Sequence, residues 1–352
     1  GKKTRIFTQL GSTFRFINPN PLMPDIEQNE LSLHQVFIDH RFSKHWMARI
    51  GRQEMSYGSH RLITFREGPN TRLAFDAAVF KYNRGKTRVD VIAISPVISK
   101  KGVFDDQNFK EFAMGIYASE RLSGKIFIDY YLLYFHSKRR QYNYVGGTEN
   151  RKVVGFRLFS ENQKANYEVE GSYQFGKFNQ LLIKAYGVSA DLNYKILPVK
   201  SLTVGLAANY LTGDENPNDN QLNTYNLIYS KPQFGLTAPI GATNLVNVNS
   251  YLKINPSRKS SIYAGANLMW RQSNHDGSYS PGAVEMRPKP DAVFTSARKE
   301  LGTLLVLETN YAANNHLSLS FDISKLVAGA YVKETGKGKD ISYISFKANY
   351  KF

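Results

Sequence analysis

Hydrophobic and polar residues alternate along most of the chain. In residues 317–324, leucine, phenylalanine and isoleucine occupy every second position, and serine and aspartate lie between them. The same alternation runs through residues 167–175 and 343–352. Strict alternation over eight or more residues is typical of a β-strand with one apolar and one polar face. No stretch of comparable length has a 3.6-residue period, so the sequence predicts an all-β fold with almost no helix.

The pattern predicts about sixteen strands. Many exceed the mean globular strand of about 5–6 residues and match the about 9–11 residues with which a tilted strand crosses a bilayer. They cover residues 4–17, 30–42, 46–54, 72–83, 86–96, 108–121, 125–138, 150–160, 165–175, 179–195, 200–212, 243–254, 260–271, 296–312, 315–326 and 341–352.

Short and long connections alternate between these strands. Tight links are expected near residues 43, 84, 123, 162, 198, 256 and 313. The intervening links are long, at 18–29, 55–71, 97–107, 139–149, 213–242, 272–295 and 327–340, with 176–178 as the one short exception. Outer-membrane barrels have short periplasmic turns and long external loops, whereas Greek-key sandwiches mix connection lengths at both ends. We therefore interpret residues 1–352 as one transmembrane antiparallel up-and-down β-barrel.

Composition narrows the alternatives. The chain has 352 residues, no cysteine, 13% aromatic residues and a net charge of +17. The lack of cysteine excludes disulfides and thiolate chemistry, and the aromatic content argues against disorder. Mean hydropathy of −0.40 would also fit a secreted β-rich protein, but a barrel that is apolar at every second residue gives the same average. Basic residues are spread along the chain, whereas a nucleic-acid module would gather them in one patch.

Several segments resemble a known family. They are residues 33–37, 50–63, 66–70, 75–76, 101–106, 212–214, 241–245 and 270–277, with the glycines and the final strand of 329–352. Together they resemble the alginate export family of outer-membrane porins, especially its Bacteroidota branch. The resemblance implies an eighteen-stranded barrel in the intact protein, so about sixteen strands here would leave an N-terminal strand pair missing. It also implies an arginine-rich pore for an acidic polysaccharide, with Arg49, Arg52, Arg72, Arg157 and Arg271 as candidates.

Strand alternation assigns further side chains to the lumen. If Phe75, Ala77 and Val79 face outward, Arg72 and Asp76 face inward; if Val154 and Phe156 face outward, Arg157 faces inward. The complete set expected to line the pore or guide substrate is Arg49, Arg52, Arg72, Asp76, Asp129, Arg157, Glu168, Arg271 and Glu308. Two interpretations stay open. The arginines could guide a polyanion by bidentate pairing, or pairs between neighbouring strands could only stabilise the inner wall.

These observations favour a channel in the bacterial outer membrane. It would pass or export an anionic sugar or a polysaccharide such as a uronate polymer; a general small-solute porin and an accessory barrel subunit are the alternatives, and a barrel enzyme is the least favoured. We expect no cofactor, metal or nucleic acid, although the oxygen-rich loop 213–242 leaves a Ca²⁺ site as an alternative. Expected partners are membrane lipid, lipopolysaccharide, an anionic saccharide and other outer-membrane or periplasmic proteins. Loops 213–242 and 272–295 are expected to constrict the pore.

Overall fold

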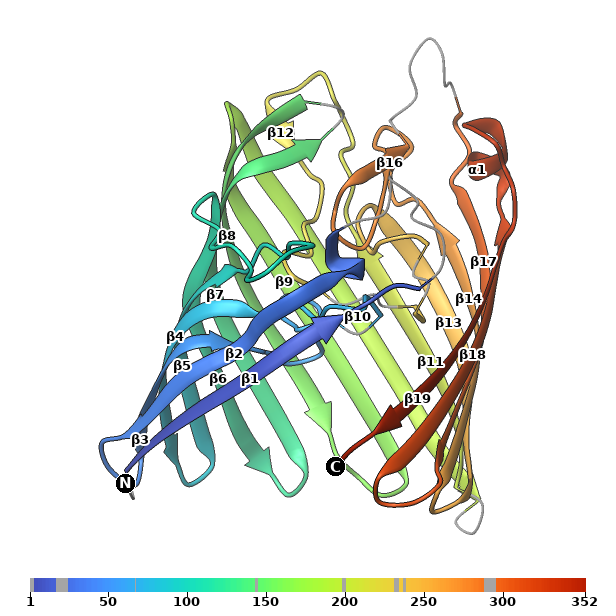
Figure 1. Cartoon of the computed structure of the whole chain (residues 1–352). Helices are drawn as coiled ribbons and strands as arrows, with labels where there is room; N and C mark the ends of the chain where they lie inside the picture. The colour runs from blue at the N-terminus through green and yellow to red at the C-terminus, as the bar shows by residue number, and fades with distance from the viewer. Residues whose placement is uncertain are drawn as a thin grey trace.

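A computed structural model describes most of the chain. The described residues are 3–16, 25–66, 68–142, 145–197, 201–230, 234–236, 239–287 and 296–352. They form one large antiparallel sheet that curves into an upright barrel, and both termini lie at the end with the short turns (Figure 1). This confirms the predicted all-β, up-and-down architecture.

Sixteen long strands make the wall and pair in chain order. They are β1 (Thr4–Thr13), β2 (Asn29–Arg41), β3 (Trp46–Gln53), β4 (Phe75–Arg84), β5 (Thr87–Pro96), β6 (Glu111–Ser123), β7 (Ile126–Tyr142), β8 (Val145–Ser160), β9 (Ala165–Phe178), β10 (Leu181–Leu197), β11 (Leu202–Leu211), β13 (Leu245–Ser257), β14 (Ser260–Trp270), β17 (Glu300–Ala312), β18 (Leu317–Ala328) and β19 (Ile341–Tyr350).

The short elements lie in the connections. The strand β12 (Gln221–Leu222) pairs in parallel with β10, and β15 (Ser278–Tyr279) pairs with β16 (Glu285–Arg287). Among the described residues, helix is limited to the 3₁₀ turn η1 (Asp25–Glu27) and the five-residue α1 (Ala330–Glu334). Within the described part of the chain, no helix has the length and apolar character needed to cross a membrane.

Every predicted strand is present, and the main difference lies at one loop. Residues 139–149 were expected to form a long loop, but β7 and β8 continue to Tyr142 and from Val145, with 143–144 outside the described residues. The register Gln141↔Gly146 and Arg140↔Gly147 shows that this segment is paired strand. The strands therefore extend beyond the apolar alternation that predicted them.

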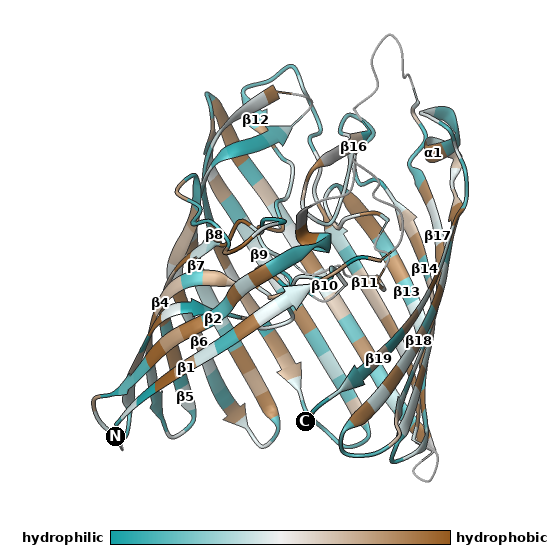
Figure 2. Cartoon of the chain, viewed as in Figure 1, coloured by the Kyte–Doolittle hydropathy of each residue, from teal (hydrophilic) through white to brown (hydrophobic). Residues whose placement is uncertain are grey.

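The outer face of the wall is apolar, and the inner face is mixed. Exposed hydrophobic side chains follow every second position of the strands, as at Phe80, Val91, Leu132 and Phe156, and Figure 2 shows the resulting alternation of brown and teal along the strands. An apolar outer band of this kind is what lipid contact requires.

The inner face carries a hydrophobic core along β4 to β8. Phe75, Ala77 and Val79 are buried there, together with Ile63 and Tyr229 from two different connections. The expectation that these three β4 residues face outward was therefore wrong. Apolar residues face the lumen here because folded-in connections cover this part of the wall.

A buried ion pair fixes one of these connections to the wall. Arg151 and Glu149 on β8 are fully buried and hydrogen-bonded to each other. Arg151 also donates to the carbonyl of Thr224 at 3.2 Å, and Asn226 donates to Glu149 at 3.2 Å. The pair thus joins the wall to the connection between β11 and β13.

Removing one partner of this pair should be costly. We expect Glu149→Gln to lower the free energy of unfolding by about 3–5 kcal/mol, because it leaves the Arg151 charge buried without a counter-ion. Denaturant unfolding of the detergent-solubilised barrel, followed by tryptophan fluorescence, measures this. The control is Asp106→Asn, which removes the exposed ion pair with Lys100 and should cost less than about 1 kcal/mol. Equal losses would contradict the assigned role of Arg151 and Glu149.

Candidate pore and binding cavity

Two connections from the long-loop end fold into the barrel and meet. They are residues 54–74, between β3 and β4, and residues 212–244, between β11 and β13. Ile63 and Tyr229 form an isolated parallel β-bridge, in which Tyr229 N donates to Leu62 O at 2.9 Å and Thr64 N donates to Tyr229 O at 3.1 Å. The lumen is therefore crossed by peptide chain.

The tip of the 54–74 connection reaches the opposite wall. Arg61 Nη1 donates to Asn209 Oδ1 of β11 at 2.6 Å, and Arg61 Nε lies 3.4 Å from Glu170 Oε2 of β9. Ser59 Oγ also donates to Glu170. Loop 213–242 was expected to constrict the pore, and residues 225–230 and 234–236 of this connection do lie inside the barrel; no such expectation was made for residues 55–71. Its other candidate, 272–295, lies partly outside the described residues.

The side-chain amide of Gln174 on β9 holds the 212–244 connection by two hydrogen bonds to its backbone. Gln174 Nε2 donates to Asn226 O at 2.8 Å, and Asn226 N donates to Gln174 Oε1 at 2.9 Å. Asp276, on the next connection, accepts from Thr224 and Tyr279, and burial raises the pKa of this carboxyl. These contacts join the 212–244 connection to the connection between β14 and β17, which contains Asp276, and the two form one assembly.

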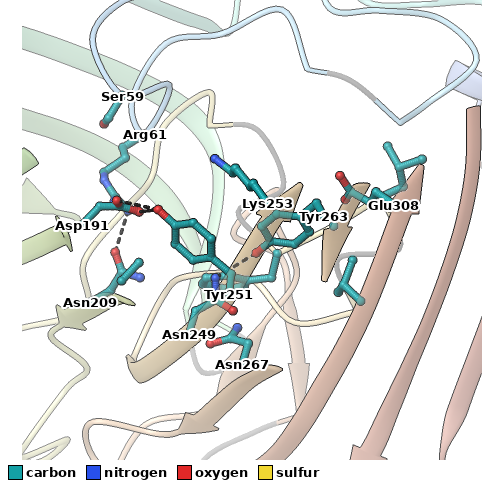
Figure 3. A pocket seen from close by; sticks show the side chains of 15 residues that line it. Ser59, Arg61, Asp191, Asn209, Asn249, Tyr251, Lys253, Tyr263, Asn267 and Glu308 are labelled. Carbon is teal, nitrogen blue, oxygen red and sulfur yellow. Dashed lines mark hydrogen bonds between the residues drawn. The ribbon is translucent and has the colours of Figure 1, made fainter. Parts of the chain in front are cut away.

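Between this assembly and the β10–β17 side of the wall lies a cavity of about 480 Å³. Figure 3 shows its polar side chains pointing toward a common space. Its lining residues come from two connections and five strands: Ser59, Arg61, Asp191, Ala207, Asn209, Phe234, Gly235, Leu236, Asn249, Tyr251, Lys253, Tyr263, Asn267, Val306 and Glu308.

Tyr251 is held flat against the wall of this cavity. It lies directly opposite Gly205 of β11, and its hydroxyl donates to Asp191 at 2.8 Å. A Cβ atom at Gly205 would lie 2.1 Å from the Tyr251 ring. Glycine at this position therefore allows the close approach of an aromatic ring to a neighbouring strand.

Three of the predicted residues meet on the inner wall. Arg157 donates to Asp129 Oδ2 at 3.1 Å and to Glu168 Oε2 at 2.5 Å, and its guanidinium lies 3.8 Å from the centre of the Phe159 ring. The alternation that placed Arg157 inward agrees with the exposed Val154 and Phe156 on the other face. This arginine is paired with two carboxylates within the wall.

Arg49 and Arg72 are also paired. Arg49 makes two hydrogen bonds to Asp39, at 2.6 and 3.0 Å, and Asp39 also accepts from Arg5. Arg72, half-exposed, has Nη1 3.6 Å from Glu54. Both guanidiniums thus have a carboxylate partner.

Arg52 and Asp76 lie on the outer face of the wall, whereas both were expected to line the pore. The two residues are in register, and Arg52 donates to both Asp76 oxygens at 2.8 and 3.0 Å. Because Phe75 and Ala77 face the interior, alternation puts Asp76 on the face of Ala78 and the exposed Phe80. The expected position of Arg52 and Asp76 in the pore lining was therefore wrong.

Arg271 and Glu308 have different surroundings. Arg271 is almost fully buried, donates to the carbonyls of Asn274, Asp276, Ser296 and Arg298, and stacks 3.8 Å from the centre of the Tyr331 ring. It organises the long-loop end and is removed from the solvent-filled lumen expected for it. Glu308 of β17 does line the cavity.

Six basic residues lie on the inner face near the short turns, and the sequence did not predict them as a group. Each comes from a different strand and shares a face with inward residues, as Arg88 pairs with Ser119 and Lys195 and Lys253 both pair with Thr203. The six, called the inner-rim cations below, are Arg41, Arg88, Arg121, Lys195, Lys253 and Lys347. None forms an ion pair with a described residue, in contrast to Arg49 and Arg157 on the same wall.

Metal ligands are not gathered anywhere in the described ranges, where no three His, Asp or Glu side chains are placed to hold an ion. The cavity is a polar space lined by charged, amide and phenol side chains. It can bind or pass a solute, and the proteins that this chain resembles indicate the same.

The sequence model of the alginate export family matches residues 2–343. The chain belongs to the alginate export family. No curated protein sequence matches it. The family and the barrel together identify a porin-type channel of the bacterial outer membrane, whose short turns are periplasmic.

Solved outer-membrane channels have the same fold. OccK3 (OpdO) of Pseudomonas aeruginosa superposes with a TM-score of 0.60 at 10% identity, over 93% of this chain and 81% of that one. OccAB1 of Acinetobacter baumannii gives 0.58 at 11% identity, over 89% and 76%. OccK2 (OpdF) of P. aeruginosa, solved in complex with glucuronate, gives 0.58 at 9% identity, over 92% and 80%.

Substitution of Gly205 should narrow the cavity. In Gly205→Ala the new methyl group would displace the Tyr251 ring from the wall into the cavity, so we expect a lower single-channel conductance in planar bilayers. Gly146→Ala is the matched control, because a Cβ there meets no atom within 4 Å. An unchanged conductance in Gly205→Ala would show that ions do not pass beside Tyr251.

Proposed function

We propose that this channel carries anionic saccharides, with uronates as the substrate class, by passive diffusion. The observation that carries the proposal is the ring of inner-rim cations at the periplasmic mouth. Charged groups without counter-ions raise the local concentration of oppositely charged solutes and their rate of entry. The predicted arginines Arg49, Arg52 and Arg157 contribute less, because each is already paired with a carboxylate.

The distribution of the net charge supports this proposal. On the inner wall, Asp129, Glu168 and Glu170 lie beside Arg157 and Arg61, so the charges of this group largely cancel. The basic excess lies instead at the short turns, where Lys44, Lys86, Lys125, Lys164 and Lys259 add to the inner-rim cations. A solute with a carboxylate would meet cations without ion pairs beside balanced ion pairs, and would bind weakly enough to leave again, as conduction requires.

The size of the cavity favours a narrow solute. A volume of about 480 Å³ falls within the roughly 300–1,000 Å³ of small-ligand pockets. It suits a single sugar, a short oligomer or one extended polymer chain. The similar channel OccK2 was solved with glucuronate, a carboxylated sugar of the proposed class.

Neutralising part of the mouth should reduce anion preference. We expect the triple variant Arg88→Gln, Arg121→Gln, Lys347→Gln to shift the reversal potential in a KCl gradient toward equal permeability of Cl⁻ and K⁺. Arg52→Gln is the control: Arg52 is paired with Asp76 on the outer face, so the reversal potential should stay at the wild-type value.

Two results would overturn the proposal. A wild-type channel that prefers K⁺ over Cl⁻ would exclude an anion pathway. Equal rates of liposome swelling with glucose and sodium glucuronate would indicate a general small-solute porin instead.

A further inference from the structure

Three asparagines form a continuous hydrogen-bond chain along the cavity wall. Asn209 Nδ2 donates to Asn247 Oδ1 at 2.8 Å, and Asn247 Nδ2 donates to Asn267 Oδ1 at 2.8 Å. They lie side by side on β11, β13 and β14, in the registers Asn209↔Asn247 and Asn249↔Asn267. We call Asn209, Asn247 and Asn267 the asparagine relay.

Arg61 sets the direction of the relay. A guanidinium can only donate hydrogen bonds, and Arg61 Nη1 lies 2.6 Å from the Asn209 side-chain oxygen. Asn209 must therefore turn its oxygen to Arg61 and its NH₂ group to Asn247, and the same orientation passes on to Asn267. In such a chain each bond polarises the next.

The relay ends on a donor without a partner. Asn267 is 98% buried and lines the cavity, and its Nδ2 has no hydrogen-bond partner among the described residues. Buried polar groups are nearly always hydrogen-bonded, so an exception needs an explanation. An oxygen atom of a bound solute would provide the missing acceptor.

A cation without a carboxylate partner lies on the same wall. Lys253 lines the cavity, with Nζ 5.0 Å from the centre of the Tyr251 ring and 5.9 Å from that of Tyr263. It is opposite Tyr263, four residues before Asn267 on β14, which is about 13 Å of strand. The length of the lysine side chain shortens that span to the size of one or two sugar rings.

We propose that this cavity is a saturable subsite for a carboxylated sugar, in which Lys253 pairs with the carboxylate and the end of the asparagine relay binds a hydroxyl or ring oxygen. Glu308 and Asp191, also in the lining, accept from sugar hydroxyl groups. The inference rests on the proposed function, because it names the place where the channel recognises its solute. Binding is weak enough for release, as transport requires.

Single-channel current block tests the subsite, with sodium D-glucuronate as the probe and D-glucose as its neutral counterpart. We expect glucuronate to interrupt the wild-type current in a saturable manner and glucose to require at least a tenfold higher concentration for half-maximal block. Lys253→Gln should bring the two half-blocking concentrations to within about threefold of each other, because only the carboxylate is affected.

The relay is tested by a pair of charge-matched variants. Asn267→Asp keeps the oxygen that accepts from Asn247 but replaces the free donor by an acceptor, so it should raise the half-blocking concentration of glucuronate by roughly tenfold or more. Asn249→Asp puts the same charge into the same cavity directly opposite Asn267 but outside the hydrogen-bond chain of the relay, so it should raise the half-blocking concentration less. Equal effects of the two variants, or undiminished discrimination in Lys253→Gln, would overturn the subsite.

The same bilayers separate this inference from the proposed function. A wild-type channel with a Cl⁻-preferring reversal potential but no block by glucuronate would refute the subsite and leave the anion channel standing. A K⁺-preferring reversal potential would refute the anion channel itself, whatever the block.

Discussion

The interior of this barrel depends on the pairing of two connections across its lumen. A peptide segment that leaves the wall exposes backbone donors and acceptors, and these need partners wherever water is excluded. Residues 62–64 and Tyr229 supply them to each other through the parallel bridge at Ile63. Ile63 and Tyr229 also bury their side chains against Phe75 and Phe135 of the wall. We call this pairing of residues 62–64 with Tyr229 the seam. Without it, the two connections would lack the hydrogen bonds that hold them to each other inside the barrel.

The seam determines how the remaining space is divided. The inner face of β4 to β8 is apolar where the connections cover it, and a second apolar cluster covers the inner face of β10 to β18 at the long-loop end. Between that cluster and the short turns, the inner face of β10 to β17 is polar and lines the cavity. Arg61 and Ser59 at the tip of the first connection then complete the far side of that cavity. The position of the passage thus follows from which parts of the wall the connections cover.

The sequence alone was sufficient for the strands but insufficient for the inside of the barrel. Alternation identified every strand of the wall because each must present an apolar face to lipid. The same rule failed at Phe75 to Val79, since apolar side chains are also required wherever a connection packs on the inner face. Arg271 failed for a related reason: it is fixed by carbonyl groups from residues 274–298, which no local pattern reveals.

The sequence also could not predict which residues meet to line the cavity. Tyr251, Lys253 and Asn267 are brought together by strand register, and Arg61 joins them from a segment more than a hundred residues away in the chain. The pairing of Arg157 with Asp129 agrees with the general interpretation that pairs between neighbouring strands stabilise the inner wall, because the two residues are in register on β7 and β8. The inner-rim cations could have been found by counting the basic residues on the inward face near each short turn. The asparagine relay could not, because it depends on hydrogen bonds between side chains of different strands.

The division of the lumen requires that the 54–74 connection stays across it while the channel conducts. Because the chain contains no cysteine, the double variant Ser59→Cys, Glu170→Cys would carry only two thiols, at positions whose native side chains are hydrogen-bonded. Dibromobimane fluoresces once both of its arms have reacted, and it can be applied to native outer membranes before single-channel recording. We expect fluorescence and the same conductance with and without the cross-link. No fluorescence, although each single cysteine reacts with monobromobimane, or a conductance that falls on cross-linking, would contradict it.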